Sequence, residues 1–170
     1  MHKIFMSTGC YIQGPGSLDL VPLVGRLVEQ RVDDRRIRFD CSLPRLHVNA
    51  DERSMTAVVG HLLQNAVEAA TDLVRIKLAG AADGTRAVIE VEDDGPGMDA
   101  DFVRDRLFRP LVSTKAGGFG IGAYQCRELT RELGGWLSVS STPGKGTTMR
   151  ATFPLAESAH IHPTRAALSS

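Results

Sequence analysis

The sequence predicts an α+β fold, a two-layer sandwich in which helices cover one face of a mixed, mostly antiparallel sheet. Three segments carry apolar residues at helical spacing, and they occur among strand-like segments, most of which form pairs divided by glycine-containing turns. Helices and hairpins that alternate in blocks are typical of this architecture. The length of 170 residues, with 42% hydrophobic and 24% charged residues, suits one compact domain.

Helices are expected at residues 20–30, 51–70 and 121–133. In the first, apolar residues recur every three or four positions, and the pattern ends near the charged residues 31–36. The second has Asp51 as its N-cap, because an aspartate before a helical pattern can satisfy a free N–H group of the first turn. The third helix is stopped by Gly134 and Gly135.

Strands are expected where apolar and polar residues alternate, at residues 37–41, 46–49, 74–78, 87–91, 136–141 and 147–153. Asp83 and Gly84 lie between the third and fourth of these segments, and a Pro-Gly-Lys-Gly stretch at residues 143–146 lies between the last two. Turn residues of this kind between alternating segments predict two β-hairpins.

The two ends of the chain show neither the helical nor the strand-like spacing of apolar residues. Residues 1–17 end in Gln-Gly-Pro-Gly-Ser, and we interpret them as a leader left by a protease site and cloning, or as disordered chain; a native loop is the alternative. Residues 156–170 are small and polar and predict a loose tail. The domain is therefore expected at residues 18–155.

The charge balance and the cysteines exclude several classes of protein. The 20 basic and 20 acidic residues cancel, so nothing indicates binding to nucleic acid or to an anionic membrane. Cys10, Cys41 and Cys126 are widely spaced and form no metal-binding or disulfide pattern, which favours a reducing cytoplasm. No run approaches the roughly 18 apolar residues of a membrane span, so we expect a soluble domain.

The first polar group lies on the second predicted helix. His61, Asn65 and Glu68 follow one another at helical spacing and therefore project from one face. An asparagine oxygen can bind Mg²⁺ when nucleotide phosphates supply other ligands. Taken alone, this group is better explained as the polar edge of a surface helix.

The second group follows the strand at 87–91 directly. Asp93 lies where the strand ends, and Gly95 and Gly97 allow a close backbone approach before Met98. A carboxylate in this place can accept a hydrogen bond from an exocyclic amine such as that of adenine. The alternative is an ordinary turn at the end of a strand.

The third group is rich in glycine and leads into the last helix. Glycines at a helix start expose backbone N–H groups to phosphate, and Ser113, Thr114 and Lys115 add hydroxyls and a positive charge. The alternative is a flexible loop. Residues 118–123 also fit a dinucleotide-binding pattern by letter, but that pattern needs a preceding strand and a βαβ unit, so we reject it.

In this order, the segments resemble the ATP-binding domain of sensor histidine kinases, in the superfamily shared with gyrase-type ATPases. The family's boxes fall in sequence: the N box at 61–70, the G1 box at 93–97, the F box at 108–110, the G2 box at 118–122 and the last glycine box at 144–147. The resemblance covers residues 19–155 and implies the Bergerat-type sandwich. Residues 113–124 and 131–135 look particularly like the kinase linked to exosortase (PEP-CTERM) systems.

The resemblance implies the role of each residue in these boxes. Asn65 would ligate Mg²⁺, Asp93 would bind the adenine amine, and Thr147 would lie near adenine, directly or through water. A lid would begin near Leu111. Independently of the resemblance, residues 111–120 combine glycines and small polar residues with few large apolar ones, which predicts that they are the most mobile internal segment without nucleotide. The implied catalytic residues are His61, Asn65 and Lys115. The implied nucleotide contacts are Asn65, Glu68, Asp93, Gly95, Gly97, Met98, Ser113, Thr114, Lys115, Gly118, Phe119, Gly120, Ile121, Gly122 and Thr147.

The role of His61 stays open. In the ATPases of the superfamily this place usually holds a glutamate that acts on water, so a histidine disfavours fast hydrolysis and suits transfer to another acceptor, assisted by proton movement. The alternative is a histidine that only forms a hydrogen bond nearby.

The function implied is the catalytic domain of a two-component sensor histidine kinase. It would bind ATP with Mg²⁺ and donate the γ-phosphoryl group to a histidine on a dimerisation domain absent from this chain. None of the five histidines has the sequence context of a phosphoacceptor. A downstream response regulator is the implied partner. The fragment is expected to be monomeric, and the whole protein a homodimeric, membrane-bound kinase with this domain in the cytoplasm. The alternatives are an anti-sigma-factor-type serine kinase of the same superfamily and a non-catalytic nucleotide-binding module.

Overall fold

The computed structural model describes residues 16–31, 34–109 and 119–156, with the backbone alone at 119–121. Eleven elements lie in these ranges: β1 (Ser17–Asp19), α1 (Leu20–Glu29), β2 (Ile37–Cys41), β3 (His47–Asn49), α2 (Glu52–Ala69), β4 (Val74–Gly80), β5 (Arg86–Asp93), α3 (Ala100–Asp105), α4 (Phe119–Glu132), β6 (Trp136–Thr142) and β7 (Gly146–Pro154). In these described ranges, no helix has both the length and the apolar character of a membrane span.

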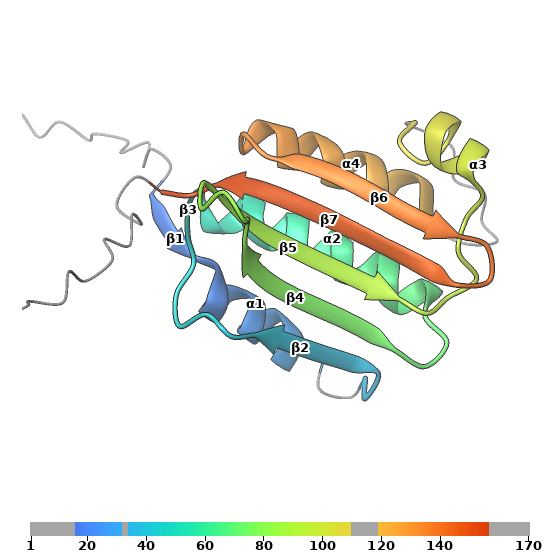
Figure 1. The fold of residues 1–170 in the computed structure, drawn as a ribbon, viewed down its shortest axis with the longest axis horizontal. Coiled ribbons are helices and arrows are strands. Elements are labelled where there is room, and N and C mark those ends of the chain that lie inside the picture. Colours follow the sequence, from blue (N-terminus) through green and yellow to red (C-terminus); the bar gives the residue numbers. More distant parts are fainter. Residues whose placement is uncertain (1–15, 32–33, 110–118, 157–170) are drawn as a thin grey trace, which may run out of the picture.

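The fold is a two-layer sandwich, which confirms the predicted α+β class. Five strands form one sheet in the order β2-β4-β5-β7-β6. The pair β2–β4 is parallel and the other pairs are antiparallel. The helices α1, α2 and α4 lie on one face of this sheet (Figure 1). A second, two-stranded sheet of β1 and β3 lies beside β7 and α1.

Aspartate caps begin three of the helices. The Asp51 side chain accepts a hydrogen bond from the Ser54 N–H at 2.8 Å, which confirms the predicted N-cap of α2. Asp19 caps α1 and also accepts from the backbone N–H of Leu46, so it joins the start of this helix to the chain before β3. The side-chain oxygen takes up a donor that the helix itself leaves free.

Two elements were not predicted from the sequence. β1 has three residues and α3 has six, and both are too short to show a period. Ser17 of β1 pairs with Asn49 of β3, so the last residue of the expected leader takes part in a strand. α3 begins after Asp99, whose side chain accepts from the N–H of Phe102.

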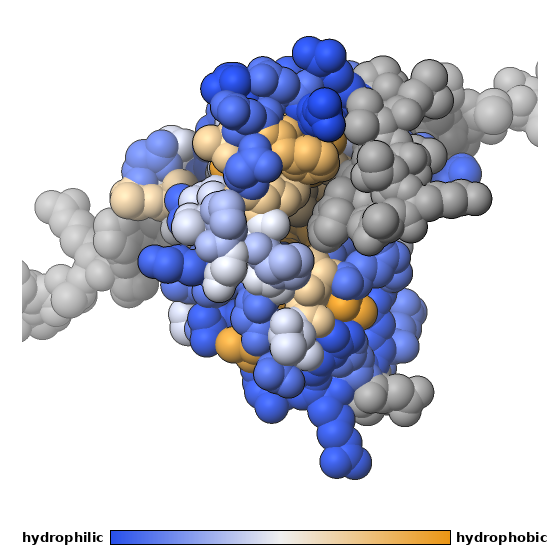
Figure 2. Space-filling model, turned by 90° about the vertical axis from the view of Figure 1, so that its right-hand side faces the viewer, coloured by the Kyte–Doolittle hydropathy of each residue, from blue (hydrophilic) through white to orange (hydrophobic). Residues whose placement is uncertain are grey.

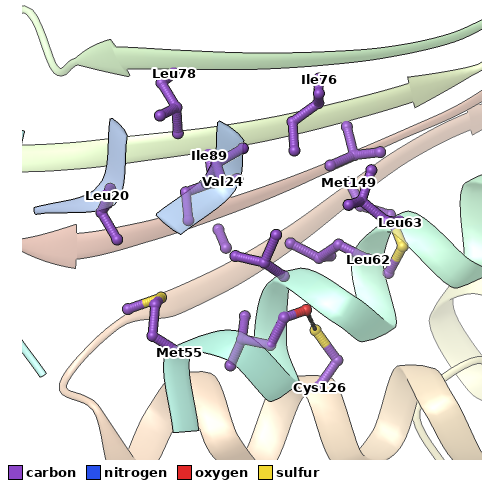
Figure 3. Packing of buried hydrophobic residues seen from close by; sticks show 14 of the residues in the cluster. Leu20, Val24, Met55, Leu62, Leu63, Ile76, Leu78, Ile89, Cys126 and Met149 are labelled. Carbon is purple, nitrogen blue, oxygen red and sulfur yellow. Dashed lines mark hydrogen bonds between the residues drawn. The ribbon is translucent and has the colours of Figure 1, made fainter. Parts of the chain in front are cut away.

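The core lies between the helices and the sheet. In Figure 3, Leu62 and Leu63 of α2 point toward Ile76, Ile89 and Met149 of the sheet. On the other side of α2, the Cys126 thiol of α4 lies 3.8 Å from the Val58 carbonyl oxygen. Burial raises the pKa of this thiol to about 12, so it behaves as an apolar core residue.

The strand registers arrange the helix-covered face of the sheet in rows. Of the rows that run across β4, β5, β7 and β6, the one farthest from Asp93 and Thr147 is called the distal row. It is formed by Leu78, Ile89, Ala151 and Leu137. The middle row is formed by Ile76, Val91, Met149 and Val139. The third row is formed by Val74, Asp93, Thr147 and Ser141. We call its three polar members, Asp93, Thr147 and Ser141, the polar row. This row lies where β5 ends and β7 begins, at the right-hand end of Figure 1.

Candidate functional site

The buried polar residues indicate where a site lies. Within the described part of the chain these are Asn65, Asp93, Thr130 and Thr147. Thr130 is explained by its own helix, because its hydroxyl donates to the Cys126 carbonyl one turn earlier, at 2.7 Å. The other three lie toward the end of α2, the end of β5 and the start of β7. They therefore gather at the end of the sheet that carries the polar row.

Asp93 is a buried carboxylate, with 6% of its surface exposed. One carboxylate oxygen accepts a hydrogen bond from the Gly95 N–H at 2.9 Å. Burial raises the pKa of Asp93, and backbone hydrogen bonds from Gly95 and Thr147 oppose that rise. No ion pair among the described residues includes this carboxylate. Asp93 therefore retains acceptor capacity that the fold itself does not use.

The next residue, Asp94, has the opposite environment. It accepts hydrogen bonds from the backbone N–H groups of Thr71 at 2.9 Å and Asp72 at 3.1 Å. Backbone hydrogen bonds, first that from Leu73, lower the pKa of Asp94. Asp94 thus holds the loop between α2 and β4 in place, which is a structural task.

The turn after Asp93 packs backbone against backbone. A Cβ atom at Gly95 would lie 2.8 Å from the carbonyl carbon of Ala69, the last residue of α2. Gly97 has a φ of +66° and a Cβ there would lie 2.7 Å from the carbonyl carbon of Thr142. Only glycine fits both places, so this turn joins the end of α2 to the β6–β7 hairpin.

Asn65 lies where α2 meets the start of α4. Its side-chain nitrogen is buried and has no hydrogen-bond partner among the described residues. A Cβ atom at Gly122 would lie 3.0 Å from the Asn65 side-chain oxygen, so the glycine lets α4 approach this amide. The two ends of an amide exchange by rotation of the side chain, and its oxygen is a ligand type that Mg²⁺ accepts. An unsatisfied buried amide therefore fits a metal or phosphate contact.

His61 and Glu68 of the same helix lie outside this buried group. His61 lines an open groove between α2 and α4, together with Tyr124, Gln125, Glu128, Leu129 and Glu132. The Glu68 carboxylate accepts a hydrogen bond from the Gln64 side chain at 2.6 Å, at the surface. The structure thus brings Asn65 together with Asp93 and Thr147, and places Glu68 apart from them.

The start of α4 differs from the prediction. The helix begins at Phe119, two residues before the predicted start, so Phe119, Gly120 and Ile121 belong to its first turn and not to a loop. The N–H groups of a first turn have no partner within the helix, and so they remain available to a ligand. The predicted phosphate contacts Ser113, Thr114, Lys115 and Gly118 lie outside the described residues, as does the lid that begins near Leu111.

Two side chains at this end were missed by sequence reasoning. The Ser141 hydroxyl contacts the Met98 N–H and the Thr147 hydroxyl, each at 2.8 Å. The Arg127 guanidinium lies 4.7 Å from the centre of the Phe108 ring and donates to the Phe108 carbonyl at 3.1 Å. Ser141 could have been found, because it stands at an inward place of the strand predicted at 136–141. The contact of Arg127 could not, since it depends on the packing of α4 against a loop.

The molecule is hollowed at this end. Figure 2, which faces it, shows apolar residues gathered in a recess with polar residues around them. Met98 of the glycine turn and Phe102 and Val103 of α3 are partly buried apolar residues of this region. A recess with an apolar wall and a few buried polar groups is the usual form of a small-molecule site.

Comparison with known proteins shows the family. Residues 50–157 match the family described as histidine kinase-, DNA gyrase B-, and HSP90-like ATPase. The sensory histidine kinase/phosphatase NtrB of Rhodobacter capsulatus is 37% identical over 131 residues, which cover 69% of this chain and 36% of that protein. The chain thus spans about a third of the length of this relative.

Two solved structures resemble the whole fold. The nucleotide-free catalytic domain of histidine kinase ThkA has a TM-score of 0.68 at 25% identity, with 82% of this chain and 97% of that domain covered. Full-length ShkA in complex with AMPPNP has a TM-score of 0.72 at 26% identity, over 83% of this chain and 31% of that protein. The chain therefore belongs to the family of histidine kinase-, DNA gyrase B- and HSP90-like ATPases, as a catalytic domain of the sensor histidine kinase type.

Proposed function

We propose that this chain binds ATP with Mg²⁺ in the recess at the polar row and supplies the γ-phosphoryl group for transfer to a histidine of another domain. The observation that carries the proposal is the gathering of Asn65, Asp93 and Thr147, which are buried at the hollowed end of a core that, among the described residues, is elsewhere apolar except for Thr130. Burying such groups costs free energy unless a partner satisfies them, and a bound nucleotide supplies that partner.

Adenine binds at the polar row in this proposal. The Asp93 carboxylate accepts a hydrogen bond from the exocyclic amine, and the Thr147 hydroxyl lies beside it. Gly95 and Gly97 let the turn after Asp93 pack against the backbone of Ala69 and Thr142, which fixes this edge of the recess, and Met98 contributes apolar surface. The raised pKa of Asp93, caused by burial, fits a carboxylate that waits for a hydrogen-bond donor.

The phosphates lie between Asn65 and the first turn of α4. The Asn65 amide oxygen would hold Mg²⁺, and the ion would neutralise phosphate charge. The N–H groups of residues 119–122 face the phosphates, and Ser113, Thr114, Lys115 and Gly118 are expected to add contacts. His61 lies one turn before Asn65 on α2, where it either assists proton movement or only forms a hydrogen bond nearby.

The acceptor histidine, the dimerisation domain and the response regulator belong to the rest of a two-component system. The relatives that share this domain are longer proteins. We place the domain in the cytoplasm, where ATP and a response regulator are found, and we expect this fragment alone to be a monomer.

Calorimetric titration tests the binding step. Both ATP and ADP should bind, and Mg²⁺ should strengthen the binding of ATP more than that of ADP. Absence of binding by either nucleotide in the presence of Mg²⁺ would contradict the proposal.

Transfer is tested with radiolabelled ATP. The chain alone should not gain acid-labile phosphate, because an acceptor nitrogen must lie in line with the γ-phosphate and His61 is held on the same helix as Asn65. Addition of a separately made dimerisation and acceptor domain should give weak transfer, since the effective concentration of a tethered domain is lost. Acid-stable phosphoserine on an added protein would support the serine-kinase alternative.

A further inference from the structure

We propose that Ser141 is a positioning residue that makes the Thr147 hydroxyl a hydrogen-bond acceptor, so that the polar row selects a purine with an exocyclic amino group over one with a carbonyl oxygen there. This inference rests on the proposed function, because it concerns how the same recess chooses its base. It assigns a role to a side chain that no sequence box contains.

Ser141 joins three segments of the recess. Its Oγ atom lies 2.8 Å from the Met98 backbone nitrogen, 2.8 Å from the Thr147 hydroxyl oxygen and 3.1 Å from the Gly146 carbonyl oxygen. Ser141 and Thr147 are direct partners in the β6–β7 register, and Thr147 and Asp93 are partners in the β5–β7 register. The three side chains thus stand side by side across three strands.

The direction of each hydrogen bond follows from counting protons. A serine hydroxyl has one proton to donate and two lone pairs to accept with. The Met98 N–H can only donate, so it uses one lone pair of Ser141. The Gly146 carbonyl can only accept, so it takes the single proton of Ser141. All three contacts form together only if Thr147 donates its own proton to the remaining lone pair of Ser141.

This arrangement leaves Thr147 without a proton for a ligand. Its oxygen keeps its lone pairs, so Thr147 can act toward a ligand in the recess only as an acceptor. Asp93 is an acceptor as well, since a carboxylate has no proton to give. An amino group offers two N–H donors to such a pair, whereas a carbonyl oxygen in its place meets only acceptors. Buried acceptors that face each other lose their hydrogen bonds and repel, which rejects the carbonyl base.

The role of Ser141 is distinct from that of Asp93. Without the serine hydroxyl, the Thr147 proton is released and can turn toward the recess. Thr147 then becomes a donor for a carbonyl oxygen, and the rejection of a carbonyl base is relaxed. Ser141 therefore acts on selectivity through Thr147, with no contact of its own to the base.

The test compares ADP with inosine diphosphate, which carries a carbonyl oxygen in place of the amino group. Both are titrated calorimetrically into the chain, and the measured quantity is the ratio of the two dissociation constants. The wild type should prefer ADP. Ser141→Ala should lower this preference by a few-fold to about tenfold, which is the effect of one hydrogen bond. The matched control is Ser140→Ala, because Ser140 is the neighbouring residue of β6 and its side chain points to the other face of the sheet.

Three further variants separate positioning from a general loss of structure. Ser141→Thr keeps the hydroxyl and should restore the wild-type ratio. In a Thr147→Val background, Ser141→Ala should leave the ratio unchanged, since the group it acts on is gone. Ser141→Cys, with a weak thiol donor of similar size, replaces Ser141→Ala if the alanine variant does not fold.

An unchanged ratio in Ser141→Ala, or the same change in Ser140→Ala, would overturn the role of Ser141. So would a full effect of Ser141→Ala in the Thr147→Val background. In each of these cases ADP still binds to the wild type and the proposed function stands. Failure of the wild type to bind either nucleotide would instead remove the proposed function itself.

Discussion

The distal row and the polar row occupy the same face of the same strands and behave in opposite ways. In the distal row, Leu78, Ile89, Ala151 and Leu137 are all apolar and at most 5% exposed. In the polar row, Asp93 and Thr147 are almost as buried but bring a carboxylate and a hydroxyl into the core. The alternation of inward and outward side chains is the same in both rows. What differs is where the rows lie, because the polar row stands at the end of the sheet where the molecule is hollowed.

The difference shows how one sheet combines a region that stabilises the fold with a region proposed to bind a ligand. Burial of the distal row stabilises the fold by removing apolar surface from water. Burial of Asp93 costs stability, and two backbone hydrogen bonds offset it only in part, as the raised pKa shows. A fold that keeps such a group gives up stability at one end for binding. The two rows should therefore respond to substitution in separate ways.

The largest expected effect is on stability, in the distal row. Ile89→Ala removes a fully buried side chain and should lower the free energy of unfolding by about 2–5 kcal/mol, through lost burial and a cavity. The affinity for ADP, measured where the variant is folded, should change less than about twofold, because the recess keeps its polar groups. Urea unfolding and calorimetry give the two quantities. A large loss of affinity in the folded variant would show that the rows are not separate.

The polar row should show the reverse pattern. Asp93→Asn should weaken ADP binding by about 10- to 100-fold, since a hydrogen bond to a charged group contributes about 1.5–3 kcal/mol. The free energy of unfolding at neutral pH should stay the same or rise, because the variant no longer buries a charge. Calorimetry and urea unfolding are again the measurements. If affinity for ADP is unchanged, Asp93 does not bind the base.

The metal role of Asn65 gives a smaller effect. Asn65→Asp adds a negative charge next to the phosphates, so its effect on ATP binding should depend on Mg²⁺. We expect the change in affinity relative to the wild type to differ by about threefold or more between titrations with and without Mg²⁺. ADP titrated without Mg²⁺ is the control. Equal effects under both conditions would contradict the ligand role.

The smallest effects are the pH dependences of the neighbours Asp93 and Asp94. The pKa of Asp93 is raised above 3.8, so its contribution to stability is present below that pH and is lost as pH rises through the folded value. The pKa of Asp94 is lowered, so its contribution is present above 3.8 and is lost as pH falls through the folded value.

Urea unfolding over this pH range should therefore give opposite trends for the two amide variants. Relative to the wild type, Asp93→Asn should gain stability as pH rises, and Asp94→Asn should regain stability as pH falls. Trends of the same sign would show that these two residues do not differ in environment as described.

Much of the fold could be predicted from the sequence. The two hairpins are confirmed by the pairs β4–β5 and β6–β7. They could be predicted because strict alternation of apolar and polar residues on both sides of a glycine-containing turn is compatible with few other structures. The sheet was expected to be mixed, and the pair β2–β4 is parallel. Nothing in the sequence of residues 37–41 indicates which strand β2 pairs with. β1 and α3 were missed because three or six residues carry no period.

The candidate site could be predicted only in part. Motif order placed Asn65, Asp93 and Thr147 in one nucleotide site, and the structure brings them to one end of the sheet; their roles remain predictions. The place of Ser141 depends on the β6–β7 register, which decides that it stands beside Thr147. The surface contact of Glu68 with Gln64 also depends on side-chain directions that helical spacing does not settle.

Amide chemical shifts measured by NMR during an ADP titration test the central claim most directly. The central claim is that the nucleotide binds at the polar row. If it does, the chemical shifts of amides in and around this row should change, at Asp93, Gly95, Gly122 and Thr147. The chemical shifts of amides at the opposite end of the sheet, including Leu78, Ala87 and Trp136, should not change. The indole of Trp136, the single tryptophan of the chain and 60% exposed, gives a second unmoved signal. Shifts that gather at the distal end, with the polar row unmoved, would contradict the account.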